Sequence, residues 1–95
     1  MYASVVEIQL KPGKMDEATE IARAMRPDLE QLNGLKQFVV IDHCHDKLLA
    51  VVIYEGKADQ EAATPKAQEI IGRLAELVAG PPERMGCEVI VNEVF

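Results

Sequence analysis

The sequence predicts an α+β fold in which four strands form an antiparallel sheet and two helices cover one face of it. Strand-type runs and amphipathic helical stretches follow one another in the order β-α-β-β-α-β, with turn signals between them. The segment Gly34–Gly56 holds two strand-like runs, Leu35–Ile41 and Leu48–Tyr54, on either side of a polar break short enough for a hairpin loop. All 95 residues are expected to form one domain.

The first half of the chain predicts a strand and then a long helix. Residues Tyr2–Leu10 alternate as a strand does, with one face formed by Ser4, Val6, Ile8 and Leu10. A helix is predicted from about Lys14 to Leu32, because apolar residues recur there at spacings of three and four. Pro27 interrupts this pattern and predicts a kink near residues 23–27. Asn33-Gly34 is expected to end the helix.

The second half predicts a helix and a last strand. Residues Ala58–Ala63 are expected to form only a short helical turn, because Thr64-Pro65 is a helix start signal. The apolar spacing after it predicts a helix that ends before Gly80. The last strand is predicted at Cys87–Phe95. These elements suit the split-βαβ, ferredoxin-like arrangement, with strand order 4-1-3-2.

The hairpin and the predicted last strand carry apolar residues on both faces. A strand with one face in water alternates between apolar and polar residues, whereas Leu48–Ile53 contains no charge. The helices cover only one face of the sheet, so the other face needs a second cover. A second copy of the same sheet supplies it most economically, which predicts a symmetric homodimer.

Composition excludes several function classes. The net charge is −6 and the basic residues are scattered, which argues against nucleic-acid binding. Aromatic residues make up only 4% of the chain, so base stacking is also disfavoured. No apolar run approaches the roughly 20 residues of a membrane helix, and the first residues do not read as a signal peptide. We expect a cytoplasmic protein whose two cysteines are free thiols.

The whole chain resembles the dimeric α+β barrel superfamily, and most closely its antibiotic-biosynthesis-monooxygenase-like domains. The resemblance is carried by Lys11–Glu17 after the first strand, the Gly34-Leu35 entry to the hairpin, the Tyr54–Lys57 exit, and the proline-ended helix before a final apolar strand. It implies a ferredoxin-like dimeric barrel. Members of the superfamily include cofactor-independent monooxygenases, haem-degrading enzymes and small proteins without assigned activity. The Asn, helical His and Trp of the haem-degrading members are missing, so that activity is disfavoured.

Several polar residues lie within otherwise apolar strands and are the candidates for ligand binding. Each is expected either to line a pocket or to lie at the sheet rim or the dimer interface. Tyr54 is the best single candidate, because a phenol can orient an aromatic substrate or donate to an oxyanion. The others are Glu7, Gln37, Asn92 and Glu93.

The hairpin loop His43-Cys44-His45-Asp46 offers two imidazoles, a thiol and a carboxylate. Adjacent residues of an extended loop point to opposite sides, and no second ligand pair lies elsewhere in the sequence. The loop is therefore interpreted as a polar turn and no metal is predicted. His43 remains a ligand-binding candidate only if the hairpin tip folds inward.

Two hypotheses of function follow. The first is a small homodimeric monooxygenase-like protein with a hydrophobic pocket that oxidises a phenol or hydroquinone without metal or flavin. The second is a non-catalytic module of the same fold that binds a hydrophobic ligand or another protein. No catalytic residue is assigned by the resemblance.

Overall fold

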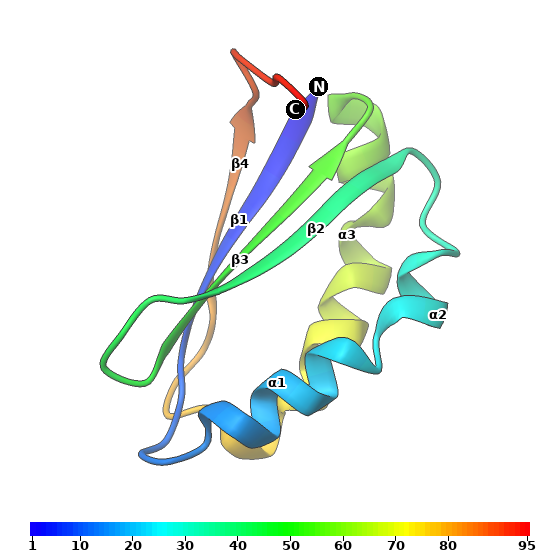
Figure 1. Ribbon diagram of the computed structural model, residues 1–95. Helices are drawn as coiled ribbons and strands as arrows, with labels where there is room; N and C mark the ends of the chain where they lie inside the picture. Colours follow the sequence, from blue (N-terminus) through cyan, green and yellow to red (C-terminus); the bar gives the residue numbers. More distant parts are fainter.

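The computed structural model describes residues 1–95, and its elements follow the predicted order. They are β1 (Tyr2–Gln9), α1 (Met15–Arg23), α2 (Arg26–Leu29), β2 (Leu35–Asp42), β3 (Lys47–Tyr54), α3 (Lys57–Ile71), the 3-10 helix η1 (Gly72–Leu77) and β4 (Glu83–Glu88). The four strands form one antiparallel sheet in the order β2-β3-β1-β4, and the helices lie on one side of it (Figure 1). The ferredoxin-like fold and the strand order are thus confirmed.

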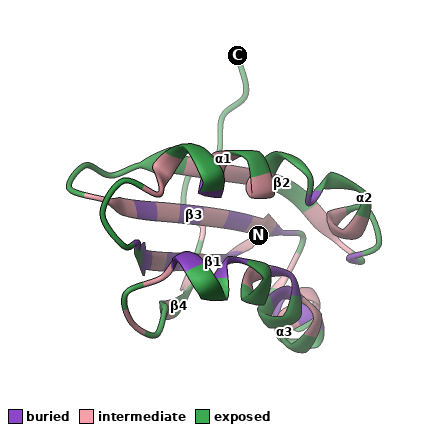
Figure 2. Ribbon diagram, turned by 90° about the horizontal axis from the view of Figure 1, so that it is seen from below, coloured by how far each residue is buried: buried purple, intermediate pink, exposed green.

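The core lies between the sheet and the helices. Every second residue of β3 is buried, which gives the banded colouring of this strand in Figure 2. The helix-facing side chains of the two central strands include Val6, Ile8, Leu48, Val52 and Tyr54. Met25, Ile70 and Leu74 pack against them from the helical layer. Removal of this apolar surface from water is the main force that holds the helices on the sheet.

The break in the first helical segment occurs where Pro27 predicts it. The chain is helical to Arg23, leaves the α-helix briefly, and resumes at Arg26. Pro27 then lies in the first turn of α2, where its missing N–H costs no hydrogen bond. Gly34 closes the segment with a φ of +76°, and its carbonyl accepts a hydrogen bond from the Glu55 N–H at 2.7 Å.

The predicted helix start at Thr64-Pro65 is wrong. A single helix, α3, begins at Lys57 and runs through Pro65. The Thr64 hydroxyl does not cap it but donates to the Gln60 carbonyl at 2.8 Å. Tertiary packing explains the earlier start, because Gln60 and Ala63 are both buried against the sheet. The carbonyl that Pro65 deprives of a donor belongs to Glu61, whose exposed position allows contact with water.

The predicted last strand is also misplaced. It was expected at Cys87–Phe95, whereas β4 covers Glu83–Glu88. The register gives the reason: Glu88 pairs with Tyr2, so β1 offers almost no backbone to pair with beyond this point. Val89 makes the last backbone hydrogen bond, donating to the Met1 carbonyl at 3.0 Å. Residues 89–95, named the tail below, project from the body of the protein (Figure 2).

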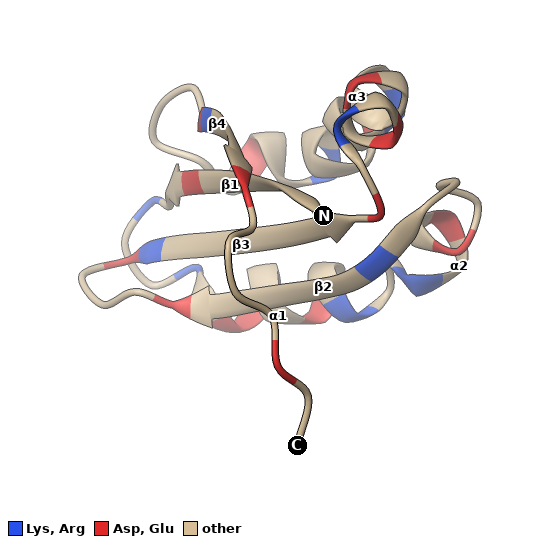
Figure 3. Ribbon diagram, turned by 90° about the horizontal axis from the view of Figure 1, so that it is seen from above, with Lys and Arg blue, Asp and Glu red and all other residues tan.

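The sheet surface opposite the helices has no cover within the chain and is called the open face. By register and strand alternation its apolar side chains are Ala3, Val5, Val39, Ile41, Leu49, Val51, Ile53, Met85 and Cys87. In Figure 3 the strands are uncharged over most of their length, with charged residues near their ends. None of the helices is long and apolar enough to cross a membrane.

Candidate functional site

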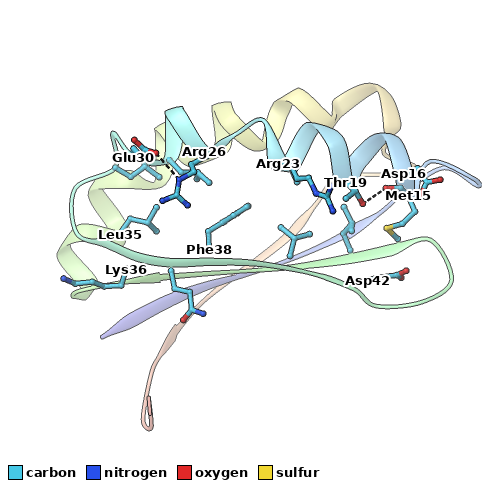
Figure 4. A pocket seen from close by; sticks show the side chains of 16 residues that line it. Met15, Asp16, Thr19, Arg23, Arg26, Glu30, Leu35, Lys36, Phe38 and Asp42 are labelled. Atoms are coloured by element: carbon cyan, nitrogen blue, oxygen red, sulfur yellow. Dashed lines mark hydrogen bonds and ion pairs between the residues drawn. The ribbon is translucent and has the colours of Figure 1, made fainter. Parts of the chain in front are cut away.

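The larger of the two main cavities is an open groove of about 930 Å³ between the α1–α2 segment and β2 (Figure 4). Half of its 16 lining residues are apolar: Met15, Ala22, Leu29, Leu32, Leu35, Phe38, Val40 and Leu48. Pockets of several hundred cubic ångströms with apolar linings and a few polar groups are the usual form of small-molecule sites. This groove is the candidate functional site.

A β-bulge in β2 shapes the groove. Leu35 lies opposite Tyr54 and Gln37 opposite Ile53, so Lys36 is an extra residue in the strand. The extra residue lets Leu35 and Phe38 share the helix-facing side although they are three positions apart. Figure 4 shows both side chains in the space between β2 and the helices. The bulge therefore adds Leu35 to the groove floor beside Phe38.

Three cations line the groove among its polar residues. Arg23 and Arg26 come from the helical side, with Arg26 nearer to Phe38, and Lys36 comes from the bulge (Figure 4). Each also lies near a surface carboxylate: Arg23 at 3.7 Å from Glu20, Arg26 at 3.1 Å from Glu30, and Lys36 at 3.0 Å from Glu55. Exposed pairs of this kind contribute at most about 1 kcal/mol, so an anionic ligand can compete for the cations.

One further ion pair lies beside the groove. Asp28 of α2 accepts a hydrogen bond from Arg73 of η1, which joins the groove roof to the opposite helix. This hydrogen bond lowers the pKa of Asp28 and raises that of Arg73. The hydrogen bond from Lys36 similarly lowers the pKa of Glu55. Both carboxylates are therefore held in the charged form.

The structure disperses the residues that the sequence nominated. Gln37 lies beside the bulge and borders the groove, although its register partner Ile53 lies on the open face. Glu7 has its register partner on the open face and lies 3.5 Å from Lys47. His43 is exposed at the hairpin tip, and Asn92 is exposed in the tail. Tyr54 is fully buried and lines neither of the two main cavities. A ligand-binding role for each of them stays a prediction.

A buried polar cluster surrounds Tyr54, and sequence reasoning missed its other members. Ser4 Oγ accepts hydrogen bonds from Gln60 Nε2 at 2.8 Å and from Arg84 Nη2 at 3.0 Å. The Tyr54 hydroxyl and two nitrogens of Arg84 are buried without a partner. Burial raises the pKa of the Tyr54 phenol, and the positive charge of Arg84 opposes the rise. The signal in the sequence was Ser4, a polar residue in the buried alternation of β1.

The hairpin tip is a tight, strained turn. Cys44, His45 and Asp46 all have positive φ values, of 67°, 55° and 62°. Asp42 Oδ1 accepts a hydrogen bond from the Cys44 N–H at 3.0 Å. The tip is tied to the loop after β1 by the Gly13 N–H, which donates to Asp46 Oδ1 at 3.3 Å. No group of three or more His, Cys, Asp or Glu side chains is arranged to hold a metal ion.

Comparison with known proteins identifies solved structures that have the same fold. No family model and no curated protein matches the sequence. A protein of unknown function from Nitrosomonas europaea, NE2512, superposes with a TM-score of 0.82 at 16% identity, over 98% of this chain and 92% of its own. A "putative antibiotic biosynthesis monooxygenase" from Bordetella bronchiseptica superposes with a TM-score of 0.80 at 16% identity, over 95% of this chain and 97% of its own.

A second "putative antibiotic biosynthesis monooxygenase", from Nitrosomonas europaea, superposes with a TM-score of 0.78 at 16% identity, over 96% of this chain and all of its own. The chain has the monooxygenase-like fold. The likeness extends over nearly the full length of each of these chains, so it includes both helical segments and all four strands. At this level of identity it concerns the fold, and the chemistry of the groove has to be argued from its own residues.

Proposed function

We propose that the groove binds a phenol or hydroquinone and that the protein promotes its oxidation by molecular oxygen without a cofactor. In the simplest case a phenol with a free para C–H reacts with one O₂ to give a quinone and one water. One oxygen atom enters the substrate and the other leaves as water, and the substrate supplies all the electrons. The role of the protein is to bind the phenolate, to orient it and to keep water away.

The observation that carries this proposal is that an aromatic side chain and cationic side chains line the same groove. Phe38 and Leu35 offer an apolar surface for a planar ring, and Arg23 and Arg26 line the same groove from the helical side, with Arg26 nearer to Phe38 (Figure 4). A guanidinium near the ring oxygen favours the ionised phenol, which is the electron-rich form that reacts with oxygen. Two proteins of the same fold are described as antibiotic biosynthesis monooxygenases, and this supports monooxygenation as the reaction.

We also propose that the working form is a homodimer in which a second copy covers the open face. The open face presents a continuous set of apolar side chains from all four strands, and Ile41 and Met85 are 41% and 66% exposed. Contiguous exposed apolar patches on this scale mark interaction sites, because leaving them in water is unfavourable. A face of this kind on two identical sheets is self-complementary, as a two-fold interface requires.

The test uses 1-naphthol as the probe, with binding followed by fluorescence and turnover by an oxygen electrode. Phe38→Ala and Arg23→Gln are expected to weaken binding at least tenfold and to reduce oxygen uptake. The matched control Lys66→Gln removes a cation from α3, away from the groove, and is expected to leave both unchanged. Circular dichroism of each variant checks that the fold is retained.

Binding without oxygen uptake favours the non-catalytic ligand-binding module of the same fold. In the same assay, Tyr54→Phe tests whether the buried cluster around Tyr54 takes part in oxygen uptake in addition to the groove. Unchanged uptake in this variant removes Tyr54 from the mechanism, whereas lost uptake with an intact fold restores the phenol as a participant. Equal binding by the wild type, Phe38→Ala and Arg23→Gln contradicts the groove as the site.

A further inference from the structure

The helix α2 forms part of the groove roof, and apolar packing alone restrains its rotation weakly. It is a single turn of four residues, none of which is fully buried. Met25 before it and Leu32 after it are buried, and Leu29 packs against the core. Contacts of this kind are non-directional. They hold α2 on the sheet, but they do not by themselves decide which of its sides faces the groove.

One polar contact ties α2 to a distant part of the chain. Asp28 accepts a hydrogen bond from Arg73 of η1, 45 positions away. Every other hydrogen bond or ion pair of residues 24–33 joins residues within about one helical turn of each other. Two further charged residues near this pair, Lys66 and Glu69, are 3.8 Å apart and pair with each other. Arg73 is therefore the one directional restraint on α2 from outside its own segment.

This ion pair is better shielded from water than the others. The Asp28 side chain is 25% exposed, less than any other side chain that forms an ion pair in the structure. Ion pairs between fully exposed side chains are screened by water and contribute little. Partial burial of Asp28 makes this contact the one most able to fix the position of a helix.

The geometry of a helical turn connects Asp28 to the groove. Successive residues of an α-helix are about 100° apart around the axis, so Arg26 and Asp28 point to nearly opposite sides of α2. Asp28 faces η1, whereas Arg26 lines the groove together with Glu30 (Figure 4). A rotation of α2 that separates Asp28 from η1 also turns Arg26 through the same angle and changes its position relative to Phe38.

We infer that Arg73 is a positioning residue for the groove: its ion pair with Asp28 fixes the rotation of α2 and thereby holds Arg26 beside the bound phenolate. The inference rests on the proposed function, because it concerns the ligand proposed for the groove. Arg73 does not itself line the groove. Its effect on a ligand therefore passes through Arg26, and this distinguishes it from a residue that binds the ligand directly.

A comparison of two ligands tests the inference. 1-Naphthol and naphthalene have the same rings, but only 1-naphthol has an oxygen that Arg26 can stabilise. Arg73→Gln is expected to weaken binding of 1-naphthol at least about threefold and to change binding of naphthalene less than about twofold. Arg73→Lys keeps the charge and should retain most of the preference for 1-naphthol. The matched control Lys57→Gln removes an exposed ion pair with Glu61 elsewhere on α3 and should behave as the wild type.

An Arg26→Gln background decides whether Arg73 acts through Arg26. Once Arg26 is replaced, Arg73→Gln is expected to cause no further loss of 1-naphthol binding, whereas two independent roles give additive losses. The charge-reversed variant Asp28→Arg/Arg73→Asp restores an ion pair and should bind 1-naphthol more tightly than either of its single substitutions. Additive losses overturn the inference, and so does an unchanged preference for 1-naphthol in a folded Arg73→Gln protein. Circular dichroism confirms the fold of each variant.

Hydrogen exchange without any ligand separates this inference from the proposed function. Exchange of residues 26–32 is expected to be at least about threefold faster in Arg73→Gln than in the wild type, with exchange in β1 unchanged. Equal exchange of residues 26–32 in the two proteins overturns the restraint of α2 by Arg73. If the wild type binds no 1-naphthol, the proposed function fails, and faster exchange in Arg73→Gln still supports this restraint.

Discussion

Gln60 of α3 donates a hydrogen bond from Nε2 to Ser4 Oγ of β1 at 2.8 Å, and both side chains are buried. The contact joins residues 56 positions apart and anchors the first turn of α3 to the central strand β1. It also orients the Ser4 hydroxyl, which accepts a second hydrogen bond from Arg84 of the edge strand. One serine thus links three elements.

Gln60→Ala is expected to lower the free energy of unfolding by about 1–3 kcal/mol, because it removes a buried hydrogen bond and leaves a small cavity. Urea denaturation followed by circular dichroism measures the change. Gln68→Ala, an exposed glutamine of the same helix, serves as the control and should change the value by less than about 0.5 kcal/mol. Equal effects of the two substitutions would show that the contact with Ser4 is not stabilising.

Gly34→Ala is expected to destabilise the protein by about 1–3 kcal/mol, since Gly34 has a positive φ and an added Cβ would overlap the Asp59 side chain. Thermal unfolding gives the readout. Gly72→Ala meets no neighbouring atom and has a negative φ, so it should be neutral or slightly stabilising. Adding Asp59→Ala to Gly34→Ala should recover only the part of the loss that is due to overlap with the Asp59 carboxyl group, because the Cβ of residue 59 remains.

The Asp28–Arg73 pair predicts a pH dependence of stability. Its hydrogen bond holds the pKa of Asp28 below the unfolded value of about 3.9, so its contribution is present above that pH. The contribution is lost as the pH falls through the lowered pKa of the folded state. The stability difference between the wild type and Asp28→Asn should therefore be positive at pH 7 and shrink as the pH falls through the lowered pKa of Asp28. A difference that does not vary between pH 7 and pH 2 would exclude this linkage.

Val51→Glu is expected to disrupt the proposed homodimer, because it places a carboxylate at the centre of the open face on each copy. Burying an unpaired charge at an interface costs several kcal/mol, so the dissociation constant should rise at least about 100-fold. Light scattering over a dilution series measures it. Ala62→Glu makes the same charge change at an exposed position of α3 and should leave the assembly intact. A wild-type monomer at micromolar concentration would contradict the dimer itself.

Much of the fold followed from local patterns. The hairpin Leu35–Tyr54 could be predicted because β-branched and apolar runs on either side of a polar break favour strands whatever surrounds them. The kink at Pro27 and the turn at Gly34 followed from backbone chemistry that is intrinsic to proline and glycine. Four strands and two helices in this order allow only a few unknotted topologies. One of them has the strand order that was predicted and that the structure shows.

The candidate site was much less accessible to sequence reasoning. The groove depends in part on the bulge at Lys36, which keeps Leu35 on the helix-facing side with Phe38, and no residue type marks a bulge of this kind. Tyr54 was a reasonable candidate by chemistry, yet register places it opposite Tyr2 and Leu35 in the interior. Arg84 gave no signal at all, because its partner Ser4 lies 80 residues away along the chain.

By itself the sequence determined the identity and order of the elements, the helix break and the apolar character of both sheet faces, because these depend on side-chain type and spacing over a few residues. Only the tertiary structure decided where elements end and which side chains meet. α3 passes through Pro65 because its buried face is held by the sheet, and β4 ends at Glu88 because β1 has no further backbone to offer. Pairing between distant segments sets these limits, and a local pattern does not contain the register of its partner.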